Sequence, residues 1–225
     1  MKGREAVFAA IRKSLRLGDD DPLRRERVQA RLRNHPRNPI PARGQKPPAE
    51  RFELFRQMLE TAKASFVLLD HKDDVPAAVT AYLRARNLPQ SIRHGDDARL
   101  ALIPWAKEVT LEVTKGASDG AQLVSVSHAF GAVAETGTLV LLSGADNPTT
   151  LNFLPDHHLV VIDERDIAGD YESVWDRIRA RFGDNRMPRV VNWITGPSRS
   201  GDIEQTQLLG AHGPRSLHVL IVRSS

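Results

Sequence analysis

The sequence predicts an α/β protein in which one domain with a mainly parallel sheet follows a basic, proline-rich N-terminal arm. Three observations predict it: short apolar runs of strand length recur along the chain, segments with helical apolar spacing separate several of them, and 11 of the 15 glycines fall between Gly116 and Gly213. Continuous apolar strands that alternate with helices are typical of a sheet covered on both faces. A chain of 225 residues can bury such a core without a metal or a disulfide.

The first 49 residues differ in composition from the rest of the chain. They carry 13 basic and 5 acidic side chains, whereas residues 50–225 carry 19 basic and 23 acidic ones. Residues 4–17 have the apolar spacing of an amphipathic helix, and the segment that follows holds six prolines and one polar helix at 22–33. We therefore expect a basic arm and linker over residues 1–49 and an α/β domain over residues 50–225.

The charge of the arm has two interpretations. The arm is a solvated tail, as like-charged and proline-rich segments commonly are, or it docks on nucleic acid, an anionic membrane surface or an acidic partner subunit. No aromatic stacking platform or recognition-helix signature accompanies the basic residues, so nucleic acid is the less favoured partner.

The expected elements of the domain follow one another in a regular order. Helices are expected where apolar residues recur every three or four positions, and strands where the apolar run is continuous. The helices lie at 52–62, 75–83 and 167–182, and the strands at 65–69, 109–113, 123–127, 138–142, 158–162, 190–194 and 217–222.

The composition excludes several classes of function. The chain contains no cysteine, which removes disulfides, cysteine nucleophiles and iron–sulfur clusters ligated by its own thiolates. No apolar run approaches the roughly 20 residues of a membrane span, and the N-terminus lacks the apolar segment of a signal peptide. We expect a cytoplasmic protein.

The first candidate site lies directly before the strand expected at 138–142. Glu135 is a candidate acid or base, and Thr136, Gly137 and Thr138 can offer hydroxyl and backbone donors to an anion. The alternative is a tight turn in which Gly137 takes a positive φ and the hydroxyls bond to local backbone groups.

The second candidate site follows the strand expected at 190–194. A strand, a Gly/Ser-rich turn and a segment that opens with Asp-Ile-Glu form an arrangement in which helix N–H groups meet an anion, and a guanidinium can bind a carboxylate or phosphate through two bonds. Capping of the helix without any ligand is the alternative. The expected ligand-binding residues are Gly196, Ser198, Arg199, Ser200 and Asp202.

The third candidate site lies before the last strand, where His212 stands beside Gly213 and Pro214. A histidine at a strand edge can transfer a proton near pH 7, although a single histidine is more often structural. His157 and His158 are adjacent in a strand and point to opposite faces, so we expect no metal site there.

Taken together and in order, these motifs resemble the lactate-utilisation protein C family of the LUD domain. Ser200 and Gly201 stand where that family usually has Thr-Ala, which bears on the fit of a ligand. The motifs that carry the resemblance are Ala134-Glu135-Thr136-Gly137-Thr138, Leu154-Pro155 with the run that follows, Gly196-Pro197-Ser198-Arg199-Ser200-Gly201-Asp202-Ile203-Glu204, and His212-Gly213-Pro214.

The resemblance implies an α/β fold of the type shared by ribose-5-phosphate isomerase and CoA transferases. It also implies a role in oxidising L-lactate to pyruvate together with iron–sulfur partner subunits, with a small carboxylate or phosphate as the ligand and no cluster on this chain. The cofactor is left open. A stand-alone enzyme of the sugar-phosphate isomerase or CoA transferase kind is the alternative, because it would use the same anion site.

Overall fold

The computed structural model describes residues 2–16, 21–183, 186–199 and 210–223. The chain divides into two compact units, Met1–Pro39 and Ile40–Ser225. Residues 40–49, which the sequence analysis placed in the arm and linker, belong to the second unit. Gln45 Nε2 donates to Asp170 Oδ2 at 2.8 Å, and Arg43 forms an ion pair with Glu135 at 2.9 Å. The second unit, called the body below, therefore begins at Ile40.

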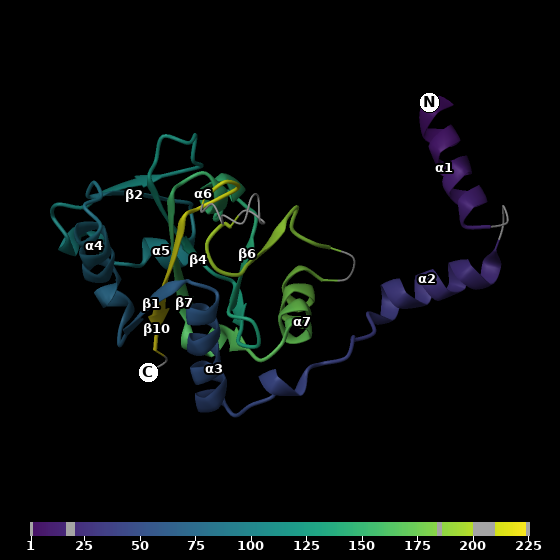
Figure 1. Ribbon diagram of the computed structural model, residues 1–225, viewed down its shortest axis with the longest axis horizontal. Helices are drawn as coiled ribbons and strands as arrows, with labels where there is room; N and C mark the ends of the chain where they lie inside the picture. Colours follow the sequence, from purple (N-terminus) through teal and green to yellow (C-terminus); the bar gives the residue numbers. More distant parts are fainter. Residues whose placement is uncertain (1, 17–20, 184–185, 200–209, 224–225) are drawn as a thin grey trace, which may run out of the picture. The chain divides into compact units, whose positions relative to one another are not determined.

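Six parallel strands form the main sheet of the body, in the order β1-β10-β7-β4-β2-β3 (Figure 1). The predicted parallel sheet is confirmed, with β3 displaced toward the C-terminus from the run at 109–113. The strand β2 was not expected because its four residues include a single apolar side chain, Ile92. The six strands are β1 (Ser65–Leu69), β2 (Ser91–His94), β3 (Glu112–Lys115), β4 (Val124–His128), β7 (His157–Asp163) and β10 (Ser216–Val222).

Side chains alternate between two buried clusters along the central strands, which shows that both faces of the main sheet are covered. Val161 in β7 packs in one cluster with residues of α4 (Val75–Ala85), and its neighbour Val160 packs in the other with Phe55 and Leu59 of α3 (Pro48–Thr61). The remaining short helices of the body are α5 (Ala98–Ala101), α6 (Thr149–Phe153), η1 (Ala42–Gly44), η2 (Lys72–Asp74), η3 (Trp105–Lys107) and η4 (Glu164–Asp166).

A second, four-stranded sheet has the order β8-β5-β6-β9, and β6 is antiparallel to both of its neighbours. The strands predicted at 138–142 and 190–194 lie here and not in the parallel sheet. The physical reason is the tight turn at residues 134–137, which reverses the chain so that β5 and β6 pair as a hairpin. The four strands are β5 (Gly131–Val133), β6 (Thr138–Leu142), β8 (Ile167–Ala168) and β9 (Val191–Ile194).

The helix α7 (Tyr171–Phe182) covers the second sheet through Val174 and Ile178, which pack against Val133 and Val140. The sequence predicted that this helix begins at residue 167. Instead, residues 167–168 pair with β5, and Asp170 caps the helix by accepting a hydrogen bond from the Ser173 N–H at 2.8 Å.

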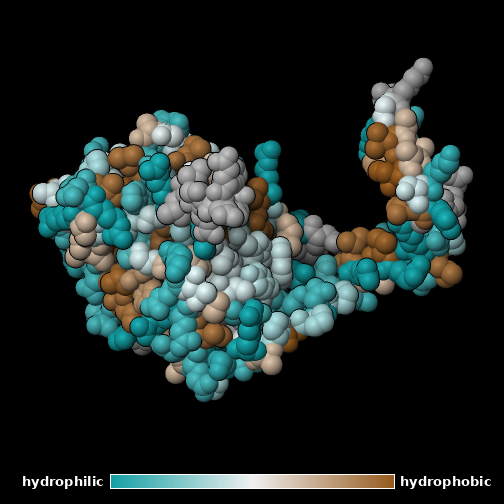
Figure 2. Space-filling model, viewed as in Figure 1, coloured by the Kyte–Doolittle hydropathy of each residue, from teal (hydrophilic) through white to brown (hydrophobic). Residues whose placement is uncertain are grey.

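The unit Met1–Pro39 contains α1 (Lys2–Ser14) and α2 (Pro22–Asn34). Among its described side chains none is buried, and Val7, Phe8, Ile11 and Leu15 are 45–59% exposed. Figure 2 shows these hydrophobic side chains gathered along α1. Within the described part of the chain, no helix is both long and apolar enough to span a bilayer.

Candidate functional site

The structure brings the first two candidate sites together at one corner of the second sheet. Strands β6 and β9 pair side by side, so the residues that flank them meet: Thr138 Oγ1 lies 2.7 Å from Thr195 Oγ1, although the two residues are 57 positions apart. We call residues 136–138 and 195–199 the glycine corner. The two segments therefore lie side by side.

The hydroxyl groups of the glycine corner bond to one another. Thr136 Oγ1, Thr138 Oγ1 and Tyr171 OH lie 2.7 to 3.0 Å apart, and Thr138 also contacts Thr195. The four hydroxyl groups have one proton each, and the four contacts use all four protons. The lone pairs that remain on these oxygens can only accept hydrogen bonds, so they cannot bind an anion. In this arrangement an anion at the corner would depend on Arg199 and on backbone N–H groups.

The last turn of α3 packs directly against both glycines of the corner. Gly137 has φ +66°, and a Cβ there would lie 2.7 Å from the carbonyl carbon of Met58. Gly196 has φ +71°, and a Cβ there would overlap the carbonyl oxygen of Ala62. The same oxygen accepts a hydrogen bond of 2.9 Å from Arg199 Nη2. These two glycines therefore allow the sheet to approach the helix, and Arg199 caps the end of the helix.

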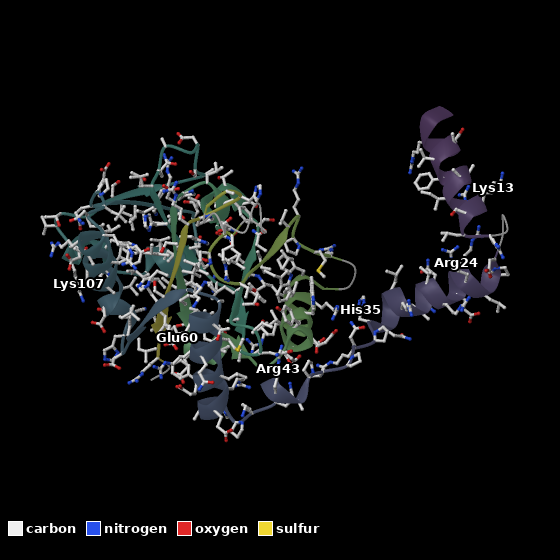
Figure 3. All side chains as sticks on the ribbon, viewed as in Figure 1. Lys13, Arg24, His35, Arg43, Glu60 and Lys107 are labelled. Atoms are coloured by element: carbon white, nitrogen blue, oxygen red, sulfur yellow. The ribbon has the colours of Figure 1, made fainter. Side chains whose placement is uncertain are left out.

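Glu135 lies beside the corner and is held by Arg43 of η1, the residue labelled in Figure 3. Arg43 Nε and Nη2 both donate to Oε1, at 3.1 and 2.9 Å. The glutamate side chain is 6% exposed and that of Arg43 61% exposed. The other carboxylate oxygen, Oε2, is buried and has no hydrogen-bond partner among the described residues. A proton-transfer role for Glu135 would use this second oxygen.

The third candidate site joins the second through Ser198. The Ser198 N–H donates to the Pro214 carbonyl at 2.8 Å, and Ser198 Oγ accepts from the His212 N–H at 3.3 Å. Gly213 packs against the Ser198 side chain, and the His212 side chain is exposed. Ser200 and Asp202, the other residues expected to bind a ligand, lie outside the described residues.

The adjacent histidines of β7 occupy two different polar environments. His158 is completely buried, its Nε2 lies 3.0 Å from Ser127 Oγ, and burial lowers its pKa to about 3. The Nδ1 of His157 lies 2.9 Å from Tyr82 OH. No group of three or more His, Asp or Glu side chains in the described ranges is arranged to hold a metal ion.

Two residues of this region, Arg43 and Tyr171, escaped the sequence analysis, and a third, Thr195, opens the second candidate site but was given no role there. Thr195 stands directly before Gly196, so its place at a strand end was a usable signal. Arg43 and Tyr171 lie 92 and 35 positions from the residues they contact, and only the tertiary structure brings them to the corner.

The fold defines an α/β protein with a parallel main sheet, the class in which small-molecule sites lie outside the carboxyl ends of the parallel strands, and the corner adds polar side chains at the edge of the second sheet. The sequence pattern is more specific. The chain belongs to the LUD domain family, which matches residues 52–222.

The curated relatives include an uncharacterized protein of Neisseria meningitidis serogroup B, 33% identical over 140 residues that make up 60% of this chain and 59% of that protein. Two proteins named Lactate utilization protein C are similar over shorter stretches. The one from Deinococcus radiodurans is 36% identical over 40% of this chain and 42% of its own length, and the one from Bacillus subtilis is 31% identical over 44% and 42%. The chain thus spans about half the length of the curated relatives it matches.

A solved structure supports the fold. The crystal structure of a DUF162 family protein from Deinococcus radiodurans aligns with a TM-score of 0.59 and 21% identity, over 79% of this chain and 99% of that one. At this identity the likeness concerns the fold alone.

Proposed function

We propose that this protein is a component of an L-lactate utilisation system that oxidises L-lactate to pyruvate in the cytoplasm. The observation that carries the proposal is the LUD domain match over residues 52–222, together with relatives named Lactate utilization protein C. The finer fold assignment, to the type shared by ribose-5-phosphate isomerase and CoA transferases, is part of this proposal, and the parallel main sheet is what supports it.

In this role the electrons pass to iron–sulfur partner subunits. Protein iron–sulfur clusters are held mainly by cysteine thiolates, and this chain has no cysteine. The clusters therefore belong to other subunits. The unit Met1–Pro39 is suited to assembly with them, because α1 carries an exposed apolar face next to Arg4, Arg12 and Lys13 and would dock on an acidic partner surface.

The ligand in this proposal is a small carboxylate or phosphate held at the glycine corner. Arg199 supplies the counter-charge, Ser198 and residues 136–138 surround the anion, and Glu135 and His212 transfer protons. Support comes from the Thr138–Thr195 contact and the Ser198–His212 contact, which bring the three segments into one region. Ser200, Asp202, Gly196 and Gly213 complete the proposed set.

Deleting the gene tests the role. Growth on L-lactate should stop while growth on pyruvate continues, and the full-length gene should restore lactate growth. Genes that carry Arg199→Ala or Glu135→Gln should fail to restore it at normal protein levels. Arg84→Ala, a change of an exposed arginine on α4, is the matched control and should restore growth. Unaffected lactate growth after deletion would refute the role.

The alternative is a stand-alone enzyme that acts on a sugar phosphate or an acyl-CoA. The parallel sheet favours it as much as it favours a lactate role, because sheets of this kind carry many chemistries. The purified chain, assayed without partners on ribose 5-phosphate and on acyl-CoA, separates the two functions. Turnover would support the enzyme, and inactivity would count against it.

A further inference from the structure

A second group of polar side chains lies away from the glycine corner, at the carboxyl ends of the parallel strands of the main sheet. Neighbouring strands are in register there: Leu69 of β1 pairs with Val222 of β10, and Val222 pairs with Asp163 of β7. Asp70 and Arg223 follow the first two directly, and both line one cavity with Asp163. Parallel α/β sheets place their ligands outside this end of the strands. We call this region the carboxyl edge.

A cavity of about 520 Å³ opens at the carboxyl edge. This volume lies within the range of ligand pockets and exceeds what a three-carbon acid fills. Its walls combine cationic and acidic side chains, chiefly Asp70, Lys72, Asp163, Arg165 and Arg223. Asp73 also lines the cavity, but it is paired with Lys107 at 2.9 Å. The described side chains that line the cavity thus include three cations and three carboxylates.

The cations at the rim are held by weak pairs. Arg223 Nη1 lies 3.2 Å from Asp70 Oδ1, and these side chains are 53% and 74% exposed. Arg165 Nη2 lies 4.0 Å from Asp163 Oδ2 and is 74% exposed. Exposed ion pairs contribute about 0–1 kcal/mol, so the Arg223 guanidinium can turn from Asp70 to a bound anion at little cost. A backbone bond of 2.9 Å from the Arg223 N–H to the Leu69 carbonyl fixes the base of the Arg223 side chain.

Asp163 is the most enclosed of the acidic groups in this cavity and is backed by a buried histidine. Its side chain is 27% exposed, and Oδ2 lies 3.7 Å from Nε2 of His128, which is 5% exposed. The His128 Nδ1 donates to the Ala129 carbonyl at 2.9 Å, which directs Nε2 toward the aspartate. Burial, followed by the nearby Arg99 guanidinium, lowers the pKa of His128. With its proton on Nδ1, the neutral imidazole has only a lone pair on Nε2 and donates nothing to Asp163, so the carboxylate keeps its acceptor oxygens for the cavity.

The end of β4 is held rigidly behind this pair. Arg99 Nη1 donates to the Ala129 carbonyl at 3.0 Å, and the same guanidinium bonds to Asp97 through Nε and Nη2, at 3.0 and 2.7 Å. Asp97 is buried, with a side chain 7% exposed. An enclosed acceptor beside exposed cations suits a ligand with a hydroxyl close to an anionic group.

We propose that the carboxyl edge binds a small hydroxylated anion, with its carboxylate or phosphate on Arg223 and Arg165 and a hydroxyl that donates to Asp163. A 2-hydroxycarboxylate and a pentose phosphate both have this combination of an anionic group and a nearby hydroxyl. The proposal stands on the cavity and its side chains and does not depend on the lactate role.

Calorimetric titration of the full chain tests this site with L-lactate and with ribose 5-phosphate. At least one of the two should bind, and Arg223→Gln should weaken that binding at least tenfold. Arg84→Gln, a change of an exposed arginine on α4, is the matched control and should leave the affinity unchanged. Circular dichroism of each variant checks the fold. If only L-lactate binds, the anionic group of the ligand is a carboxylate, and if only ribose 5-phosphate binds, it is a phosphate.

The hydroxyl contact has its own test. The intact chain should prefer L-lactate to propionate, or ribose 5-phosphate to inorganic phosphate, and Asp163→Ala should remove that preference. The proposal is overturned if neither compound binds, if the hydroxyl preference survives in Asp163→Ala, or if binding depends on Arg199 and not on Arg223. A lactate growth defect with no binding here would leave the proposed function standing and remove only this site.

Discussion

The carboxyl edge of the parallel sheet and the glycine corner of the second sheet are both polar, but their polar groups are held differently. At the corner, four hydroxyls bond to one another, and both glycines pack against backbone atoms of α3. At the carboxyl edge, the charged groups form exposed pairs around a cavity of about 520 Å³. The comparison shows that a glycine at a strand end can indicate close packing of the chain as readily as it indicates a ligand site.

The difference predicts where substitutions change stability and where they change binding. Buried groups that already have partners lose those partners when they are changed, and the protein is destabilised. Exposed charges at the rim of a cavity contribute little to the folded state, so their loss should appear in binding.

Among the substitutions, the largest expected effect on stability comes from Gly196→Ala in the corner. The new Cβ would overlap the Ala62 carbonyl oxygen at a residue with φ +71°, and backbone strain and overpacking together should cost about 3 kcal/mol. Urea unfolding measures the loss. Gly120→Ala is the control, because Gly120 has φ +95° with open space around it and should show only the strain. Equal losses in the two variants would contradict close packing at the corner.

A smaller effect is expected from Arg43→Ala. The change leaves the Glu135 carboxylate buried without its cation, and we expect a loss of about 2 kcal/mol in the free energy of unfolding. The double variant Arg43→Ala/Glu135→Gln should recover part of this loss, because the neutral amide is cheaper to bury than the charge. A double variant less stable than Arg43→Ala would show that Glu135 is stabilised by other groups.

The parallel sheet should be sensitive to acid. Burial lowers the pKa of His158 to about 3 and that of His218 to about 4, whereas a histidine in the unfolded chain titrates near pH 6.5. Between these pH values the unfolded chain binds more protons than the folded chain does. The contribution of these histidines to the free energy of unfolding is therefore fully present above about pH 6.5 and is lost as the pH decreases below it. Each histidine contributes a slope of up to about 1.4 kcal/mol per pH unit.

Urea unfolding between pH 7.5 and 4.5 checks this slope. His218→Gln should make the dependence on pH shallower, because one of the buried neutral imidazoles is removed. A profile that stays flat below pH 6.5 would contradict the burial of these two histidines in a neutral form.

The smallest stability effect is expected at the carboxyl edge. Arg223→Gln removes an exposed pair with Asp70 and should change the free energy of unfolding by at most about 0.5 kcal/mol. Urea unfolding measures this, and the same variant should weaken ligand binding at least tenfold. A large loss of stability would show that Arg223 belongs to the packed part of the protein, as Gly196 does.

The sequence predicted the buried parallel strands well because their signal is local. A continuous apolar run such as the one in β10 cannot lie in solvent, and both faces of that strand are indeed buried. The three short strands β2, β5 and β8 were missed, since two to four residues carry too little pattern. The apolar run in β6 was recognised, but its sheet was not, because an apolar run does not specify its neighbour.

The candidate sites show the same limit. The sequence located the turns around Gly137 and Gly196 because glycine marks unusual backbone conformations. It could not show that α3 fills the space beside them, or that Glu135 pairs with Arg43 across 92 positions. Asp70, Asp163 and Arg223 each stand at the end of an apolar run, a signal that was available and becomes informative only when the strands are known to be neighbours.

The sequence by itself determined the longer elements of this protein, its family and its lack of thiol ligands, because periodicity, motif order and composition are properties of the chain. The tertiary structure decided which polar residues share a site. The ends of β1, β7 and β10 are distant along the chain and become adjacent through parallel pairing. The same folding places the end of α3 against the two glycines of the corner, where the sequence had suggested room for a ligand.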